Sequence, residues 1–494
     1  MQSRLMNRSR NFILCSALLG LLAGQAGGAT LEEQLQAVLG PKPEPGAVCG
    51  AVVVDLQTGK VLLDIHGDET LIPASNAKVF SLAAAIDVLG PGFEFRTVVA
   101  TRGDDLIVVG DGDPSLADPE GAGKPSDPVA ALFDGWAARL REKGLEVLAG
   151  DLVIDESIFE PARDHPQWPS EDIGRAYAAP PGALNLYENS VLFTIKPAAK
   201  AGDPVQWSVY PPNGLVEVRN RGKSAAKGKN APVLYRPRPT FEYQLSGTCT
   251  AETKSSLAVP DPGMFFADVL RTHLANRGIR IEGKIRRERV RDEQGRLPPD
   301  CAVVLVHTTP LTHVAARVGK DSQNLFAEAL LKRTGYAFAR AAGEANPRGS
   351  WATGRAAVED FLKRVGVEEG HVVPADASGL SRANRSSARA MVQVLAYMHK
   401  HPGWPLFARS LAVAGRDGTL KRRMKDVPGL VCAKTGYIGG VRTLSGYVET
   451  PDRRMYAFAV LFNGFKKASR PFTKMQDQFC EVLAKSKPDA VGTP

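Results

Sequence analysis

Residues 72–80 read IPASNAKVF, in which a serine stands three positions before a lysine at the start of an apolar helical run. This spacing places Ser75 and Lys78 on one face of the first helical turn, where a neutral amine could remove the hydroxyl proton. Burial in an apolar helix would lower the lysine pKa and so favour the neutral amine. The pattern alone is equally typical of an ordinary helix start. Ser224 and Lys227 repeat it in a glycine- and lysine-rich segment without apolar flanks, where we expect no burial.

The flanking sequence predicts the sheet against which this helix packs. Residues 49–67 read as two strands around a turn at 57–60, which is a hairpin signature. Near the other end of the chain, GLVCAKTG, RTLSGYVET and RRMYAFAVLFNG are three strand candidates with short connections, followed by a helix at 472–486. Pairing of the two chain ends would give a five-stranded antiparallel sheet flanked by helices. The fold class is therefore α+β.

The chain of 494 residues is too long for one hydrophobic core, so we expect more than one domain. The sequence pattern of residues 96–261 differs from that of the flanking segments and predicts short strands, many turns and polar loops. We interpret them as one or two smaller β-rich inserted domains, in which the short strands near 195–242 could form a sub-domain. Residues 30–95 and 262–494 would then be the two parts of the outer domain.

The N-terminal residues 1–29 have the pattern of a secretory signal peptide. Arg4, Arg8 and Arg10 precede the apolar run FILCSALLGLLAG, and small residues follow it. The run is too short for a comfortable membrane span, and no later stretch has the length and apolarity of one. We therefore expect a secreted protein without a transmembrane anchor.

Charge and cysteine content exclude some classes of function. The net charge of +9 is not concentrated enough to indicate nucleic acid as a partner. Loss of Cys15 with the signal peptide leaves five cysteines, an odd number, so at least one thiol stays free or pairs between chains. Their spacing matches no zinc site, and we expect most of them to be buried small side chains and no metal to be bound.

Two further motifs carry chemistry. Ser322-Gln323-Asn324 opens a helical segment, where a serine is ordinarily an N-cap. Lys434-Thr435-Gly436 ends an apolar strand and would bring a cation and a hydroxyl to one sheet edge, while its glycine would let another segment approach closely. Tyr187-Glu188-Asn189 is a rival for the S-x-N role, because Y-x-N serves in some serine acyl-transfer sites. We prefer Ser322, which lies in the outer domain with the other motifs.

The order S-x-x-K, S-x-N, K-T-G is that of penicillin-binding proteins and class A β-lactamases. With the stretches GDGDPSL, GDLVIDES, ALNLYENS, DASGLSRANR, GRDGTLKRR and AKTGYIGGVRTLSGYV, the chain resembles the D-alanyl-D-alanine carboxypeptidase/endopeptidase family. These are low-molecular-mass class C penicillin-binding proteins with inserted domains. The resemblance covers essentially the whole mature chain, and the long gap between Ser75 and Ser322 leaves room for the insertions.

The resemblance implies a β-lactamase/transpeptidase-like outer domain and a cofactor-free serine DD-peptidase of the periplasm or cell envelope. Its partners would be peptidoglycan stem peptides, with β-lactam antibiotics as inhibitors. Ser75 would be the nucleophile, Lys78 its base and Ser322 a proton relay. The residues expected to bind substrate are Asn324, Lys434, Thr435, Gly436 and Tyr437.

Two positions depart from the family pattern. Tyr437 stands where a small hydroxyl residue is usual. Its backbone N–H could still donate to the oxyanion together with that of Ser75. Its ring, however, could narrow the space for substrate along this strand. Gln323 replaces a common aspartate. Neither change removes a catalytic atom.

Two alternative functions stay open at this stage. A β-lactamase or esterase of the same fold would need fast deacylation, for which Glu359 in EDFLK comes close to the usual element, although it reads as the solvated face of an amphipathic helix. A non-catalytic peptidoglycan-binding protein would be expected to lack Ser75, Lys78 or Lys434, and all three are present. The loop DASGLSRANR at 376–385 should lie near the site, with no role assigned to its residues.

Overall fold

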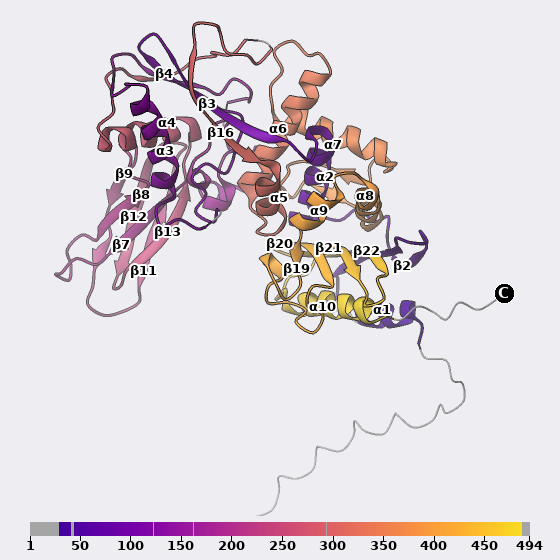
Figure 1. Ribbon diagram of the computed structural model, residues 1–494. Coiled ribbons are helices and arrows are strands. Elements are labelled where there is room, and N and C mark those ends of the chain that lie inside the picture. Colours follow the sequence, from indigo (N-terminus) through magenta and orange to yellow (C-terminus); the bar gives the residue numbers. More distant parts are fainter. Residues whose placement is uncertain (1–28, 41–43, 122, 162, 293, 487–494) are drawn as a thin grey trace, which may run out of the picture.

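The computed structural model describes residues 29–40, 44–121, 123–161, 163–292 and 294–486 (Figure 1). The predicted signal peptide lies outside these residues except for its last one. Within the described ranges, no helix is both long and apolar enough to cross a membrane.

Figure 1 shows two lobes side by side. We call the described residues among 29–93 and 311–486 the sheet lobe, and the described residues among 94–310 the inserted lobe. The sheet lobe is built on one antiparallel sheet in the order β19-β20-β21-β22-β1-β2. Its strands are β1 (Val48–Asp55), β2 (Val61–Ile65), β19 (Ala412–Val413), β20 (Val431–Ile438), β21 (Val441–Glu449) and β22 (Met455–Asn463).

The two ends of the chain pair in this sheet as the sequence predicts. β1 runs antiparallel to β22 along its full length, from Val48 opposite Asn463 to Asp55 opposite Tyr456. The five expected strands are all present. The sheet gains a sixth, β19, which sequence patterning missed because two residues are too few to show a period.

Helices cover both faces of the sheet. On one face lie α1 (Leu31–Leu39) and α10 (Arg470–Lys485), which pack against each other below the strands in Figure 1. The helices gathered above the sheet in Figure 1 are α2 (Ala77–Leu89), α5 (Leu311–Gly319), α6 (Asn324–Ala341), α7 (Trp351–Val365), α8 (Ala388–Lys400) and α9 (Trp404–Ser410).

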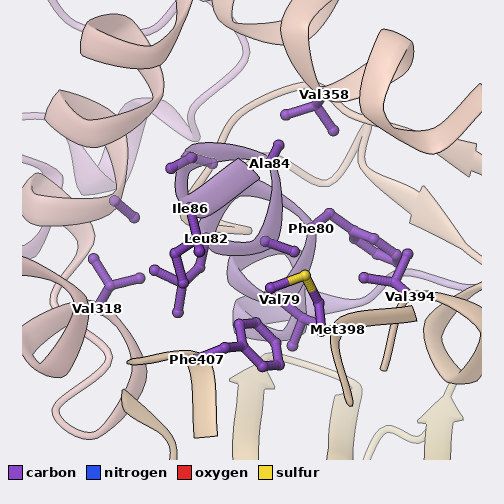
Figure 2. Close-up of a cluster of buried hydrophobic side chains, with 14 of the residues drawn as sticks. Val79, Phe80, Leu82, Ala84, Ile86, Val318, Val358, Val394, Met398 and Phe407 are labelled. Atoms are coloured by element: carbon purple, nitrogen blue, oxygen red, sulfur yellow. The ribbon is translucent and has the colours of Figure 1, made fainter. Parts of the chain in front are cut away.

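Helix α2 is the centre of that second layer. It is apolar on all sides, and such a helix is stable only where other elements surround it. Figure 2 shows its side chains enclosed by residues from the neighbouring helices. The labelled residues of α2 are Val79, Phe80, Leu82, Ala84 and Ile86, and those around them are Val318, Val358, Val394, Met398 and Phe407. Lys78 therefore lies in the first turn of a helix whose residues 77–86 are all buried.

The inserted lobe contains a five-stranded sheet in the order β15-β6-β4-β3-β16. Its strands are β3 (Glu94–Arg102), β4 (Asp105–Val109), β6 (Leu152–Asp155), β15 (Ile285–Arg287) and β16 (Ala302–Pro310), and α3 (Pro128–Glu142) and α4 (Pro262–Asn276) belong to the same core. β16 pairs with β3 beyond the predicted boundary at residue 261. The domain boundaries stay a prediction, and we propose from this pairing that the second lies near Pro310.

Smaller sheets complete the inserted lobe, at the lower left in Figure 1. β13 (Thr253–Ala258), β7 (Ser190–Lys196) and β8 (Gln206–Tyr210) form one; β12 (Glu242–Cys249) pairs with β9 (Glu217–Asn220), β10 (Lys223–Ser224) and β11 (Ala231–Tyr235) in another. β5 (Val147–Leu148) pairs with β14 (Arg280–Ile281) in this lobe. A further short pair, β17 (Val372–Val373) with β18 (Arg385–Ser386), belongs to the sheet lobe.

The prediction that most of the five cysteines are buried is confirmed. Cys49, Cys249 and Cys480 are buried, whereas Cys301 and Cys432 are partly exposed.

Candidate active site

Ser75 lies in a short 3-10 turn, η1 (Ala74–Asn76), which leads directly into α2. The sheet holds this turn from below. Asn76 Nδ2 donates to Thr443 Oγ1 at 2.5 Å, and the Thr443 hydroxyl in turn donates to the Pro73 carbonyl at 2.8 Å. Ala74 has a φ of +46°, a conformation that costs about 1 kcal/mol and persists only where surrounding contacts fix it. The serine is therefore presented on a fixed backbone.

The Lys78 amine faces three acceptors and is fully buried. Nζ lies 3.1 Å from Ser75 Oγ, 2.7 Å from Asn324 Oδ1 and 2.7 Å from the Ser378 carbonyl oxygen. Burial lowers the pKa of Lys78 to about 7, against the opposing effect of Asp376 and Glu328. A neutral amine has two N–H bonds and one lone pair. When Asn324 and Ser378 take the two N–H bonds, the lone pair faces the Ser75 hydroxyl.

Asn324 is the first residue of α6, and its amide orientation is set from the inserted lobe. Its Nδ2 donates to the Tyr177 carbonyl at 2.8 Å, so that Oδ1 is left to accept from Lys78. Tyr177 belongs to a 3-10 turn, η3 (Ala176–Ala178). The insertion thus contributes a backbone acceptor to the site, one that sequence reasoning did not single out.

Ser322 and Lys434 form a second pair of a serine and a lysine. Lys434 Nζ donates to Ser322 Oγ at 2.8 Å and to the Thr435 carbonyl at 2.9 Å. Burial, with a further effect of the Lys78 charge, holds the pKa of Lys434 well below its usual value. Ser322 has a φ of +60°, which is uncommon for a serine and marks a backbone fixed by its surroundings.

Arg317 of α5 fixes the loop before Ser322. Its carbonyl accepts from the Gln323 N–H at 3.0 Å, and its guanidinium donates to Asp321 at 2.7 Å. The same guanidinium binds Asp118 at 2.8 Å and Glu188 at 2.5 Å, both from the inserted lobe. This ion network, in which Arg317 and Asp118 are buried, joins the two lobes beside the S-x-N motif.

The rest of the K-T-G strand lines the sheet edge. Thr435 Oγ1 donates to Thr419 Oγ1 at 2.9 Å. Gly436 packs against η1, where a β-carbon would stand 2.1 Å from Thr443 Oγ1, so the close approach predicted for this glycine is present. Tyr437 is 56% exposed, and its ring lies under the Arg442 guanidinium, 5.1 Å from the ring centroid.

A cavity of about 570 Å³ joins these residues. Ser75, Ser322, Asn324 and Tyr437 line it from the sheet lobe, and Tyr177 lines it from the inserted lobe. The structure therefore brings the three motifs predicted from sequence to one cleft. An arrangement of a buried neutral amine beside a serine, with a second lysine–serine pair opposite, is suited to nucleophilic acyl transfer.

The loop 376–385 forms a third wall. Asp376 accepts from the Gly379 N–H and the Ser381 N–H, both at 2.7 Å, so the loop is held by its own side chain. The role of its Ser378 carbonyl toward Lys78 could not be foreseen, because a backbone acceptor leaves no mark in the sequence.

The other motifs lie elsewhere. Asn189 is buried and bonds the Pro180 carbonyl and Asn185, so the Y-x-N rival serves the structure of the inserted lobe. Ser224 is in β10; the expectation that it would not be buried was wrong, since its Oγ accepts from the Ala198 N–H within that lobe. Glu359 lies on the exposed side of α7.

Comparisons with known proteins agree with this geometry. The model of a family described as "D-Ala-D-Ala carboxypeptidase 3 (S13) family" matches residues 31–485. The D-alanyl-D-alanine carboxypeptidase of Actinomadura sp. is 33% identical over 463 residues, 88% of this chain and 81% of that protein. The D-alanyl-D-alanine carboxypeptidase DacB of Haemophilus influenzae is 26% identical over 439 residues, 85% and 86% of the two chains.

The fold has a counterpart among solved structures. Penicillin binding protein 4 (dacB) from Haemophilus influenzae superposes with a TM-score of 0.76 at 23% identity, covering 92% of this chain and 99% of that one. A second structure of that protein, complexed with a β-lactam, gives a TM-score of 0.71 over 92% and 100% of the chains at 22% identity. The α+β, transpeptidase-like architecture expected from the sequence is confirmed.

Proposed function

The chain belongs to the D-Ala-D-Ala carboxypeptidase 3 (S13) family and is a serine DD-peptidase, and we propose that Ser75 is its nucleophile and Lys78 the base that activates it. The observation that carries this proposal is the environment of the Lys78 amine. Two of its three acceptors, Asn324 Oδ1 and the Ser378 carbonyl, are fixed, and the third is the Ser75 hydroxyl at 3.1 Å.

The reaction would begin with the neutral amine of Lys78. Its lone pair takes the proton of Ser75 Oγ, which attacks the carbonyl carbon of the penultimate D-alanine. The backbone N–H groups of Ser75 and Tyr437 hold the developing oxyanion, each worth about 3 kcal/mol in comparable sites. Ser322, beside Lys434, passes a proton to the leaving amine, and water then hydrolyses the acyl-enzyme.

The second lysine and its strand would recognise the substrate. Lys434 and Thr435 would engage the terminal carboxylate of the leaving D-alanine, and the Thr419 hydroxyl lies beside that of Thr435. Gly436 lets the strand approach the nucleophile turn, and Asn324 serves both Lys78 and the substrate amide. The substrates are peptidoglycan stem peptides and D-alanyl cross-bridges.

A β-lactam would follow the first half of this reaction and stop at the acyl-enzyme. The Haemophilus influenzae protein has been seen in complex with a β-lactam, which supports the same class of inhibitor here. The exposed position of Glu359 gives no support to a β-lactamase. We also propose secretion to the periplasm or cell envelope, since residues 1–29 have the pattern of a signal peptide.

The test is covalent labelling of the mature protein with a fluorescent penicillin, followed by mapping of the labelled peptide. We expect one label per chain, on the peptide containing ASNAK, and none in Ser75→Ala. Ser224→Ala is the matched control because it removes the serine of the other S-x-x-K, and it should label like the wild type. Label that persists in Ser75→Ala, or rapid penicillin turnover without stable label, would contradict the proposal.

A further inference from the structure

Glu328 is a buried carboxylate that none of the three motifs includes. It lies on α6 one turn after Asn324, so both side chains are on the same helix face. Its exposed fraction is 0%. Three N–H groups converge on it: Ser378 N at 2.8 Å, Ala377 N at 3.3 Å and Trp351 Nε1 at 2.9 Å. Because all three of these groups are donors, the ionised form of the carboxylate accepts all three hydrogen bonds.

These contacts connect Glu328 to the reacting atoms through one residue. The Ser378 N–H is held by Glu328, and the Ser378 carbonyl accepts from Lys78 Nζ at 2.7 Å. The next residue, Gly379, packs so closely that a β-carbon there would stand 1.8 Å from the Ala74 carbonyl oxygen and 2.9 Å from Ser75 N. A shift of this loop would therefore move both the acceptor of the amine and the nucleophile turn.

Charge is the second connection. Glu328 raises the pKa of Lys78 against the larger, opposing effect of burial. Burial, and the like charge of Asp376, raise the pKa of Glu328 to about 7. The ionisable groups around this cluster are Lys78 on α2, Lys434 on β20 near Lys78, Asp376 on the loop, Lys332 on α6 with Glu160 beside it, and His165 near Asp376 with Arg355 near His165.

We propose that Glu328 is a positioning residue for this site: its carboxylate holds Ala377 and Ser378 so that the Ser378 carbonyl directs the Lys78 amine toward Ser75, and its negative charge acts on that amine. This inference rests on the proposed function, because it assumes that Lys78 is the base. Glu328 touches neither Ser75 nor the cavity and acts only through its neighbours.

The test compares the pH profiles of penicillin acylation for the wild type, Glu328→Gln and Glu328→Asp. Glutamine keeps the size but loses the charge, so the ammonium form of Lys78 is less favoured and the acid limb should move to lower pH by about half a unit or more. Aspartate keeps the charge, but its shorter side chain cannot hold residues 377 and 378 in the same position. The plateau rate of acylation should therefore fall about tenfold, while the pH of the acid limb stays unchanged. The matched control is Glu359→Gln, the same change on the exposed side of α7, which should alter neither.

The inference is overturned if the acid limb of Glu328→Gln coincides with that of the wild type, whatever its plateau. Should Glu328→Gln fail to fold, Glu328→Asp decides: a plateau equal to that of the wild type overturns the positioning role. Failure of the proposed function looks different, because the wild type itself would then not be labelled at Ser75.

Discussion

Replacement of Gly436 by alanine should separate the nucleophile turn from the sheet. An added β-carbon would stand 2.1 Å from Thr443 Oγ1, 2.9 Å from the Pro73 carbonyl oxygen and 3.0 Å from Asn76 Nδ2. Ordinary van der Waals contact begins at 3.4 Å, which is 1.3 Å more than the 2.1 Å to Thr443 Oγ1. Thr443 cannot turn away freely, since its hydroxyl accepts from Asn76 and donates to Pro73.

The expected loss follows from that displacement. Overpacking a filled site costs about 1–3 kcal/mol of folding free energy, which a protein of this size should tolerate. A misplacement of about 1 Å at a reacting group can cost a factor of about 100 in rate. We therefore expect Gly436→Ala to fold, with penicillin acylation of Ser75 slowed about 100-fold.

The assay is the second-order rate of fluorescent penicillin labelling, with the melting temperature and circular dichroism measured on the same samples. Gly135→Ala is the matched control: its β-carbon on the exposed side of α3 meets no atom within 4 Å, so labelling should be unchanged and stability should rise by about 0.5–1 kcal/mol. Adding Thr443→Ala to Gly436→Ala removes the nearest clashing atom and should recover part of the rate. Labelling of Gly436→Ala within threefold of the wild type would refute the reasoning.

Three further outcomes are expected. Because Lys78 must be neutral to act as a base and burial lowers its pKa to about 7, acylation should rise with pH through about 7, and a flat profile from pH 5 to 9 would contradict this role. Arg317→Met leaves the buried carboxylate of Asp118 without its guanidinium partner, so thermal unfolding should show a loss of about 3 kcal/mol together with slower labelling; an unchanged melting temperature would contradict the bracing role. Thr419→Val removes the hydroxyl partner of Thr435, which can donate to Thr435 Oγ1 once the Thr435 hydroxyl turns to the substrate carboxylate, so kcat/KM for a peptide ending in a free D-alanine carboxylate should fall about fivefold, with little change for the corresponding C-terminal amide.

Local patterns in the sequence determined the elements and one contact of the site. The hairpin at 49–67 and the three C-terminal strands follow from period-two patterning and turn residues, and their pairing into one sheet is confirmed. Ser75 and Lys78 are neighbours because residues three apart share a helix face. The resemblance in motif order then indicated which of the S-x-x-K copies mattered.

Only the tertiary structure decided what surrounds Lys78. Asn324 and Ser378 reach its amine from 246 and 300 residues away, and no local period encodes a contact of that kind. In the sequence Glu328 resembles any polar residue of a helix. Only the folded chain brings Trp351 Nε1 and the backbone N–H groups of residues 377 and 378 to its carboxylate. The sequence thus specifies which groups are present and the local geometry of each motif. Burial and long-range packing determine the protonation state of Lys78 and the direction in which its amine points.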